Sequence, residues 1–145
     1  MMITIRPAHS EDHPAIADLI SELAASSEET TPITPEFVRH FLEFPGSGVL
    51  VAEEDQQVVG MLSYSLRPNL FHAGNSCTIE ELIVTQAYRS RGIGGSLLER
   101  LLHQLLRQVC TEVSVSTMPD NHEAIAFYKS HGLIDEAIYL EKHFR

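Results

Sequence analysis

The stretch IEELIVTQAYRSRGIGGSL, residues 79–97, decides the fold. Its first six residues are β-branched and apolar around two glutamates, which is typical of a strand. Glycines follow at 92, 94 and 95, and leucine pairs then recur at helical spacing. Free N–H groups converge at the start of such a helix, where its dipole is positive. The stretch therefore predicts a strand, a glycine-rich turn and a helix whose start can hold phosphate.

Two common phosphate-binding turns do not fit this stretch. A P-loop requires GxxxxGK[ST], and no lysine stands at the required place. A dinucleotide fingerprint requires GxGxxG, but Leu97 occupies the position of the third glycine. The glycine turn thus needs another explanation.

The sequence around this stretch predicts both strands and helices. Strands are expected over residues 2–6, 48–54, 57–66, 78–85, 112–117 and 138–144, and helices over 10–25, 35–44, 94–110 and 121–132. Ser10 and Thr34 are expected to cap the first two helices, and Gly132 to end the last. Residues 67–76 are expected to form a loop. This order indicates a mixed α/β sheet in a single domain over residues 1–145.

Composition excludes several classes of protein. The 145 residues carry 20 acidic and 10 basic side chains, a net charge of −10, which argues against nucleic acid as a partner. No apolar run approaches the ~18 residues of a membrane span, and no signal peptide precedes the first strand, so a cytoplasmic protein without a membrane partner is expected. Cys77 and Cys110 stand alone without a CxxC pair, so both are expected to be reduced thiols. The histidines are scattered and form no metal-binding motif, so no metal site is expected.

The acidic side chains are unevenly distributed. Residues 1–60 contain eleven acids against Arg6 and Arg39, a net charge of −9, and the remaining 85 residues are nearly balanced. Such a block is either a solvated face or a field that attracts a cationic substrate.

Two motifs carry a family resemblance. Arg89-x-x-Gly92-x-Gly94 matches the signature R/Q-x-x-G-x-G/A, and Asn121-x-x-Ala124-x-x-Phe127-Tyr128-x-x-x-Gly132 is similar to N-x-x-A-x-x-F-Y-x-x-x-G-F, with Leu133 in place of the last Phe. Both are motifs of the GNAT N-acetyltransferase superfamily. The chain looks most similar to the branch that acetylates small amines, which includes aminoalkylphosphonate and some aminoglycoside acetyltransferases. The resemblance implies a mixed, mostly antiparallel sheet flanked by about four helices.

The resemblance also implies an activity. The acetyl group of acetyl-CoA, bound as co-substrate, would pass to a primary amine of a small molecule by direct attack in a ternary complex. Alternatives are acetylation of protein N-termini or lysines, for which the conformation of residues 67–75 would be decisive, and a non-catalytic acyl-CoA sensor. A homodimer is left open.

Three residues are expected to carry the chemistry. By similarity, Glu80 relays the amine proton, Glu81 holds a cationic substrate and Tyr128 protonates the departing thiolate. Strand alternation sends Glu80 and Glu81 to opposite faces of the sheet unless a bulge intervenes.

A second set is expected to bind acetyl-CoA. Strand backbone would pair with the pantetheine arm, the glycine turn would hold the phosphates, and an asparagine would bond the arm; Asn121 could equally be a plain helix cap. These residues are Leu82, Ile83, Val84, Arg89, Arg91, Gly92, Ile93, Gly94, Gly95, Ser96 and Asn121.

Overall fold

A computed structural model describes residues 2–144 of the chain. Its elements, in chain order, are β1 (Thr4–Pro7), α1 (His13–Ser26), α2 (Pro35–Glu43), β2 (Ser47–Glu54), β3 (Gln57–Asn69), β4 (Gly74–Val84), α3 (Ile93–Leu105), β5 (Cys110–Val115) and α4 (His122–Ser130). Short 3₁₀ turns at Ser10–Asp12 and Gln86–Tyr88 precede α1 and α3. None of the helices between residues 2 and 144 has both the length and the apolar composition of a transmembrane segment.

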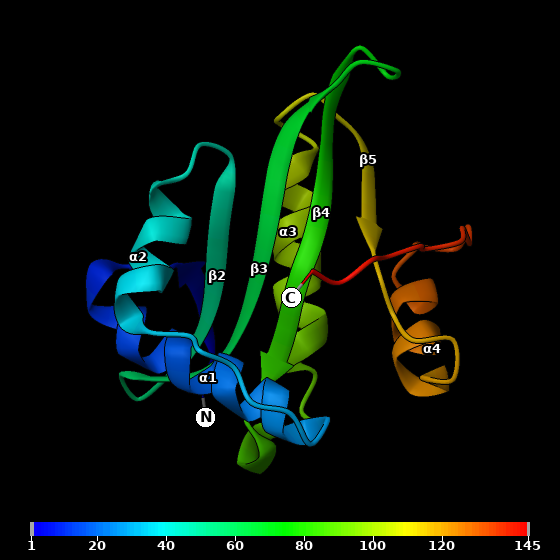
Figure 1. Cartoon of the computed structure of the whole chain (residues 1–145). Helices are drawn as coiled ribbons and strands as arrows, with labels where there is room; N and C mark the ends of the chain where they lie inside the picture. Colours follow the sequence, from blue (N-terminus) through cyan, green and yellow to red (C-terminus); the bar gives the residue numbers. More distant parts are fainter. Residues whose placement is uncertain (1, 145) are drawn as a thin grey trace.

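The five strands form one mixed sheet in the order β1-β2-β3-β4-β5 (Figure 1). The first four strands are antiparallel to their neighbours, and β5 is parallel to β4. Helices α1 and α2 cover one face of the sheet and α3 the other (Figure 1). The predicted fold class, a mostly antiparallel mixed sheet with four helices, is confirmed.

Each face of the sheet has its own apolar core. The leucine stripe of α3 is fully buried against the strands, with Leu97, Leu98 and Leu101 each 0% exposed. On the other face, Ile16 and Leu19 of α1 pack with side chains of β2, β3 and β4. The sheet is therefore held rigidly between two layers, and residues at its open end are held in fixed positions.

Several predicted boundaries were wrong. Ser10 does not cap α1, because residues 10–12 form a 3₁₀ turn and Asp12 precedes the helix. The expected loop 67–76 is mostly strand, since the β3–β4 ladder continues to Asn69↔Gly74 and leaves only residues 70–73 as the turn. In α3, the helix already ends at Leu105. By contrast, Thr34 caps α2 as predicted, its Oγ1 accepting from the Phe37 N–H at 3.1 Å.

The expected last strand is absent from the described residues. Residues 133–144 form no helix or strand. An alternating pattern needs a neighbouring strand, and no register pairs this segment with β5 or any other strand. Gly132 does end α4 as predicted, with a φ of +97° that favours glycine.

Arg6 on β1 joins three segments of the acidic first half. Its guanidinium donates two hydrogen bonds to the Asp12 carboxylate, at 2.7 and 3.1 Å, and its Nε donates to Glu53 Oε1 at 2.9 Å. The hydrogen bond from Arg6 is the main reason that the pKa of Asp12 is lowered. Part of the acidic excess is thus neutralised within the fold.

Replacing Arg6 by alanine is expected to lower the free energy of unfolding at neutral pH by about 2 kcal/mol, because Glu53 and Asp12 both lose the guanidinium and Asp12 keeps, among the described residues, only the His9 N–H as a donor. Because the folded pKa of Asp12 is depressed, its contribution is present above the pKa of an unfolded aspartate, about 4, and is lost as pH falls through the folded value. Urea unfolding at several pH values measures both effects. Arg107→Ala is the control, since Arg107 forms no ion pair within residues 2–144; equal effects of the two substitutions would contradict the assignment.

Candidate functional site

Strand β4 leaves its neighbour β5 halfway along its length. The parallel register ends at Ile79↔Val115, while β4 continues to Val84 beside β3. The Thr85 N–H donates to the Val59 carbonyl at 2.8 Å. Bonded positions alternate along an antiparallel ladder, so Leu82 and Val84 direct their backbone groups away from β3, toward the open edge. An extended ligand can add to the sheet there.

Ile83 differs from its two neighbours. By the same alternation its backbone faces β3, and its side chain is 5% exposed within the core beneath α1 and α2. Of the three consecutive residues predicted to meet the cofactor, the geometry therefore brings only Leu82 and Val84 to the open edge.

The start of α3 lies directly after this edge. Gly92 has a φ of +78°, and the first helical hydrogen bond runs from the Ser96 N–H to the Gly92 carbonyl at 3.0 Å. The N–H groups of Ile93, Gly94 and Gly95 consequently have no partner inside the helix. A Cβ added to Gly92 would meet no atom within 4 Å, and one added to Gly94 would come no closer than 3.8 Å to Phe127. The turn is open to a ligand that accepts hydrogen bonds.

The two arginines predicted beside the phosphates have contacts within the protein. Arg89 donates from Nε to the Val84 carbonyl at 2.8 Å and forms an ion pair with Glu22 at 3.2 Å. Arg91 stacks over the Tyr88 ring at 4.9 Å. Arg89 thus connects the end of β4 to α1 and fixes the turn.

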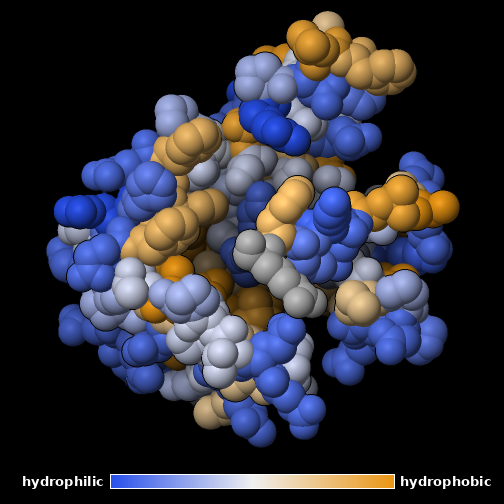
Figure 2. Space-filling view, viewed as in Figure 1, coloured by the Kyte–Doolittle hydropathy of each residue, from blue (hydrophilic) through white to orange (hydrophobic). Residues whose placement is uncertain are grey.

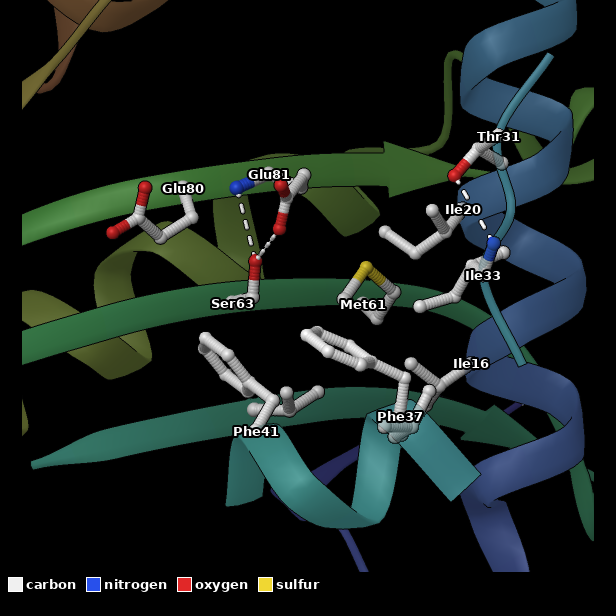
Figure 3. A pocket seen from close by; sticks show the side chains of 12 residues that line it. Ile16, Ile20, Thr31, Ile33, Phe37, Phe41, Met61, Ser63, Glu80 and Glu81 are labelled. Carbon is white, nitrogen blue, oxygen red and sulfur yellow. Dashed lines mark hydrogen bonds between the residues drawn. The ribbon is translucent and has the colours of Figure 1, made fainter. Parts of the chain in front are cut away.

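A β-bulge places both glutamates on the same face of the sheet. The β3–β4 register passes from Ser63↔Glu81 to Tyr64↔Ile79, so Glu80 has no partner opposite it. The extra residue cancels the alternation between Glu80 and Glu81. Figure 3 shows both carboxylates on the side of the sheet that carries α1 and α2.

The two carboxylates have different surroundings. Glu81 is half-buried, accepts a hydrogen bond from the Ser63 hydroxyl, and its own N–H donates to Ser63 Oγ at 3.0 Å. Burial raises the pKa of Glu81. Glu80 is exposed and accepts from the Ser65 hydroxyl at 3.0 Å. The pair therefore joins a desolvated carboxylate to one that meets solvent.

The carboxylates lie at one side of a pocket of about 300 Å³ between the sheet and the first two helices (Figure 3). Figure 2 shows a hollow with an apolar floor on this face of the molecule. The remaining lining residues are Ile16, Ile20, Thr31, Ile33, Phe37, Val38, Phe41, Val49, Met61 and Ser63. Such a concave, mostly apolar site with a few convergent polar groups suits a small molecule.

The other two predicted residues, Tyr128 and Asn121, lie within α4 and directly before it. Tyr128 is half-buried, its ring meets that of Phe127 edge-on at 5.1 Å, and burial raises the pKa of its hydroxyl. Within residues 2–144, no protein group hydrogen-bonds that hydroxyl. The side chain of Asn121 caps α4 by accepting from the Ala124 N–H at 3.2 Å.

Sequence reasoning missed the apolar wall and the two serines. Phe37 and Phe41 are four residues apart on α2, so they share a face, but their spacing equally suits a core helix. Ser63 and Ser65 interrupt an otherwise apolar strand at alternate positions, which was a readable sign of a polar site. Residues 2–144 hold no cluster of three His, Cys, Asp or Glu side chains arranged to ligate a metal ion.

The comparison with known proteins adds the decisive observation. The model of the "Acetyltransferase (GNAT) family" matches residues 14–133. This chain belongs to the GNAT family. The matched residues of this GNAT chain include the β-bulge at Glu80, the glycine turn and the open edge of β4.

Curated relatives of this GNAT chain are N-acetyltransferases. Aminoalkylphosphonate N-acetyltransferase of Salmonella typhimurium is 30% identical over 142 residues, 97% of this chain and 87% of the relative. Thialysine N-epsilon-acetyltransferase of Sus scrofa is 27% identical over 144 residues, 92% of this chain and 85% of the relative. These relatives confirm the predicted enzyme class.

A solved structure supports the fold. An aminoglycoside acetyltransferase from an uncultured soil metagenomic sample, in complex with trehalose, superposes with a TM-score of 0.84 at 21% identity, over 99% of this chain and 95% of that one.

Proposed function

We propose that this GNAT chain transfers the acetyl group of acetyl-CoA to a primary amine of a small molecule by direct attack in a ternary complex. The observation that carries the proposal is the β-bulge that brings Glu80 and Glu81 together beside the open edge of β4. In the overall reaction the amine nitrogen forms a bond to the acetyl carbon, the carbon–sulfur bond breaks, and the thiolate receives a proton.

The residues at the open edge and the glycine turn fit acetyl-CoA. The backbone of Leu82 and the N–H of Val84, whose carbonyl accepts from Arg89, would pair with the pantetheine amides, and the free N–H groups at the start of α3 would hold the phosphates. When bound, acetyl-CoA supplies the activated acetyl group as a thioester. Arg89 acts as a positioning residue, since its guanidinium ties the turn to β4 and α1.

Glu81 binds the ammonium form of the amine, and Glu80 accepts its proton. An alkyl amine is protonated at neutral pH, so it arrives as an ammonium ion that needs a carboxylate and must then lose a proton. Half-buried Glu81, held by Ser63, suits the first task. Exposed Glu80 suits the second, because it can pass the proton to water.

Tyr128 supplies the proton that the departing sulfur needs. The reference pKa of a phenol is ~10, near the ~8.5 of a thiol, so proton transfer to the thiolate is feasible. Burial raises the pKa of Tyr128 and keeps its hydroxyl protonated. The absence of a protein partner for this hydroxyl within residues 2–144 leaves its proton available.

Direct attack is favoured over transfer through a cysteine. Burial raises the pKa of Cys77 to about 12, so almost none of it is thiolate at neutral pH. Cys110 lies at the start of β5, at the opposite end of the β4–β5 register from the point where the strands part.

Amine-dependent release of free thiol from acetyl-CoA tests the function. A panel of small primary amines should give thiol and N-acetylated amine in equal amounts. Binding of acetyl-CoA with no thiol release would favour the sensor alternative, and release with lysine-bearing peptides but no small amine would favour a protein acetyltransferase.

Gly94→Val is expected to weaken acetyl-CoA binding by more than tenfold, because the side chain enters the space that the ligand needs at the helix start. The nearest atoms to a Cβ at Gly94 lie at ordinary contact distances, so the fold should persist. Gly92 is less suitable, since its φ of +78° adds backbone strain to any substitution. Calorimetric titration measures the affinity, with Ala126→Val on α4 as the control for added bulk; unchanged affinity in a folded Gly94→Val variant would contradict the site.

Glu81→Gln is expected to raise the KM for the amine by at least tenfold, because it removes a partly desolvated charge that pairs with the ammonium. Burial raises the pKa of Glu81. As pH is lowered, kcat/KM should therefore begin to fall at a pH above the pKa of an ordinary glutamate, which is about 4.3. The substitution should abolish this acid limb while thermal stability is kept, as the burial cost of the charge is also removed. An unchanged KM would contradict the role of Glu81.

A further inference from the structure

The pocket between the sheet, α1 and α2, called the acceptor pocket from here on, is charged on one side only among its described residues. Of its 12 lining residues, eight are apolar, two are hydroxyl-bearing, and the two charged ones are Glu80 and Glu81. Among residues 2–144, no lysine, arginine or histidine lines it. Apart from the hydroxyl groups of Thr31 and Ser63, the rest of the wall offers hydrocarbon and aromatic surface.

The two hydroxyl groups in the wall are already hydrogen-bonded. Ser63 is bound to Glu81, and Thr31 Oγ1 accepts from the Ile33 N–H at 3.3 Å. A ligand rich in hydroxyl groups would therefore find few partners, and a phosphonate or carboxylate would find no cation among the described lining residues. Either group would have to give up its hydration without replacement.

Phe37 lies where the apolar part of the acceptor pocket opens to solvent. Its ring lines the pocket although the side chain is 56% exposed, and Phe41 stands one helical turn further along α2 (Figure 3). An aromatic ring left uncovered beside a concave apolar surface gains most from a ligand that buries it. The side chains of Met61 and Ile20 lie across from it.

We infer that the acceptor is a primary amine on an uncharged, apolar body, an alkyl or aryl-alkyl chain whose ammonium end meets Glu81 and Glu80. The inference rests on the proposed function and narrows its substrate class. It separates this chain from relatives named for an aminoalkylphosphonate or for thialysine, since neither a phosphonate nor a second ammonium has a partner among the described residues at the apolar end.

The acidic first half of the chain does not alter this conclusion. None of the eleven acids in the described part of residues 1–60 lines the acceptor pocket. Glu11, Asp12, Asp18 and Glu22 instead line a separate depression near Thr85. These four acids thus lie outside the acceptor pocket, and the acceptor is selected by its apolar body.

The test compares three amines of similar length by thiol release: hexylamine, cadaverine and aminopentylphosphonate. Hexylamine and cadaverine have the same number of heavy atoms and differ only in a methyl or an ammonium at the far end. Hexylamine should exceed cadaverine in kcat/KM by at least about tenfold, because the apolar end must desolvate the second charge. Lengthening from butylamine to hexylamine should raise kcat/KM about three- to fourfold per methylene.

Two variants assign the preference to the pocket. Phe37→Ala should lower kcat/KM for hexylamine about tenfold and for cadaverine by less than about twofold, because the ring contacts the hydrocarbon. Phe44→Ala is the matched control, since Phe44 is a 65% exposed phenylalanine at the end of α2 that does not line the pocket. An equal or higher kcat/KM for cadaverine or the phosphonate, or equal losses in both variants, would overturn the inference. Thiol release with none of the amines would instead overturn the proposed function.

Discussion

Glu80→Gln is expected to lower kcat at neutral pH by a factor of about 10² to 10³, the usual size of a lost acid–base group. The amide keeps the shape of the side chain and its contact with Ser65, but it cannot accept the proton of the ammonium ion. Because a larger fraction of the amine is neutral at high pH, part of the lost rate should return as pH approaches 10. Steady-state kinetics across this pH range measure both effects.

Glu43→Gln is the matched control for this substitution. Glu43 is an exposed glutamate at the end of α2 that does not line the pocket, so the variant changes the net charge equally. Its activity should match that of the unaltered chain. Full activity of Glu80→Gln at neutral pH would contradict this role of Glu80 and would mean that Glu81 or water accepts the amine proton.

Tyr128→Phe is expected to lower kcat about 100-fold or more, while the affinity for acetyl-CoA stays within about twofold. Phenylalanine retains the ring and its edge-on contact with Phe127, so the packing of α4 is preserved. Only the proton donor is lost. The raised pKa of Tyr128 also predicts that activity falls at high pH only above the ordinary tyrosine value of ~10, and the variant should lack this limb.

Tyr139→Phe is the control for the loss of a phenol, because Tyr139 is 67% exposed in the segment after α4. It should be fully active. If Tyr128→Phe retained the same kcat as this control, protonation of the thiolate by Tyr128 would be ruled out.

The regular elements were readable because burial imposes a period on the sequence. The leucine pairs of α3 repeat every third or fourth residue, and all three of Leu97, Leu98 and Leu101 face the sheet. The glycine turn was readable because a positive φ, as at Gly92, leaves a residue-specific mark. The motif of this turn and the second motif at Asn121–Gly132 were together enough to predict the family.

The arrangement of the acids was not readable, because it depends on one residue of register. Nothing in the letters IEELIV shows that Glu80 is the extra residue of a bulge, yet that bulge decides whether one carboxylate or two face the pocket. The role of Asn121 was equally ambiguous, since a cap and a ligand contact use the same amide. The apolar wall depends on how α2 packs against β3, a contact between segments far apart in sequence.

The failed predictions have a common physical cause. A turn is placed from composition, but strand ends are set by pairing, so the β3–β4 hairpin extended through residues expected to form a loop. Residues 138–144 alternate as a strand does, yet alternation alone forms no ladder without a neighbour.

Initial-rate kinetics with both substrates varied test the central claim most directly. The rate of thiol release is measured over a matrix of acetyl-CoA and hexylamine concentrations, and the acetylated amine is identified by mass. Direct attack within a ternary complex predicts reciprocal plots that intersect, with one N-acetylated amine per thiol released. Parallel lines, which indicate a covalent acetyl-enzyme intermediate, or thiol release that does not depend on the amine, would contradict the account.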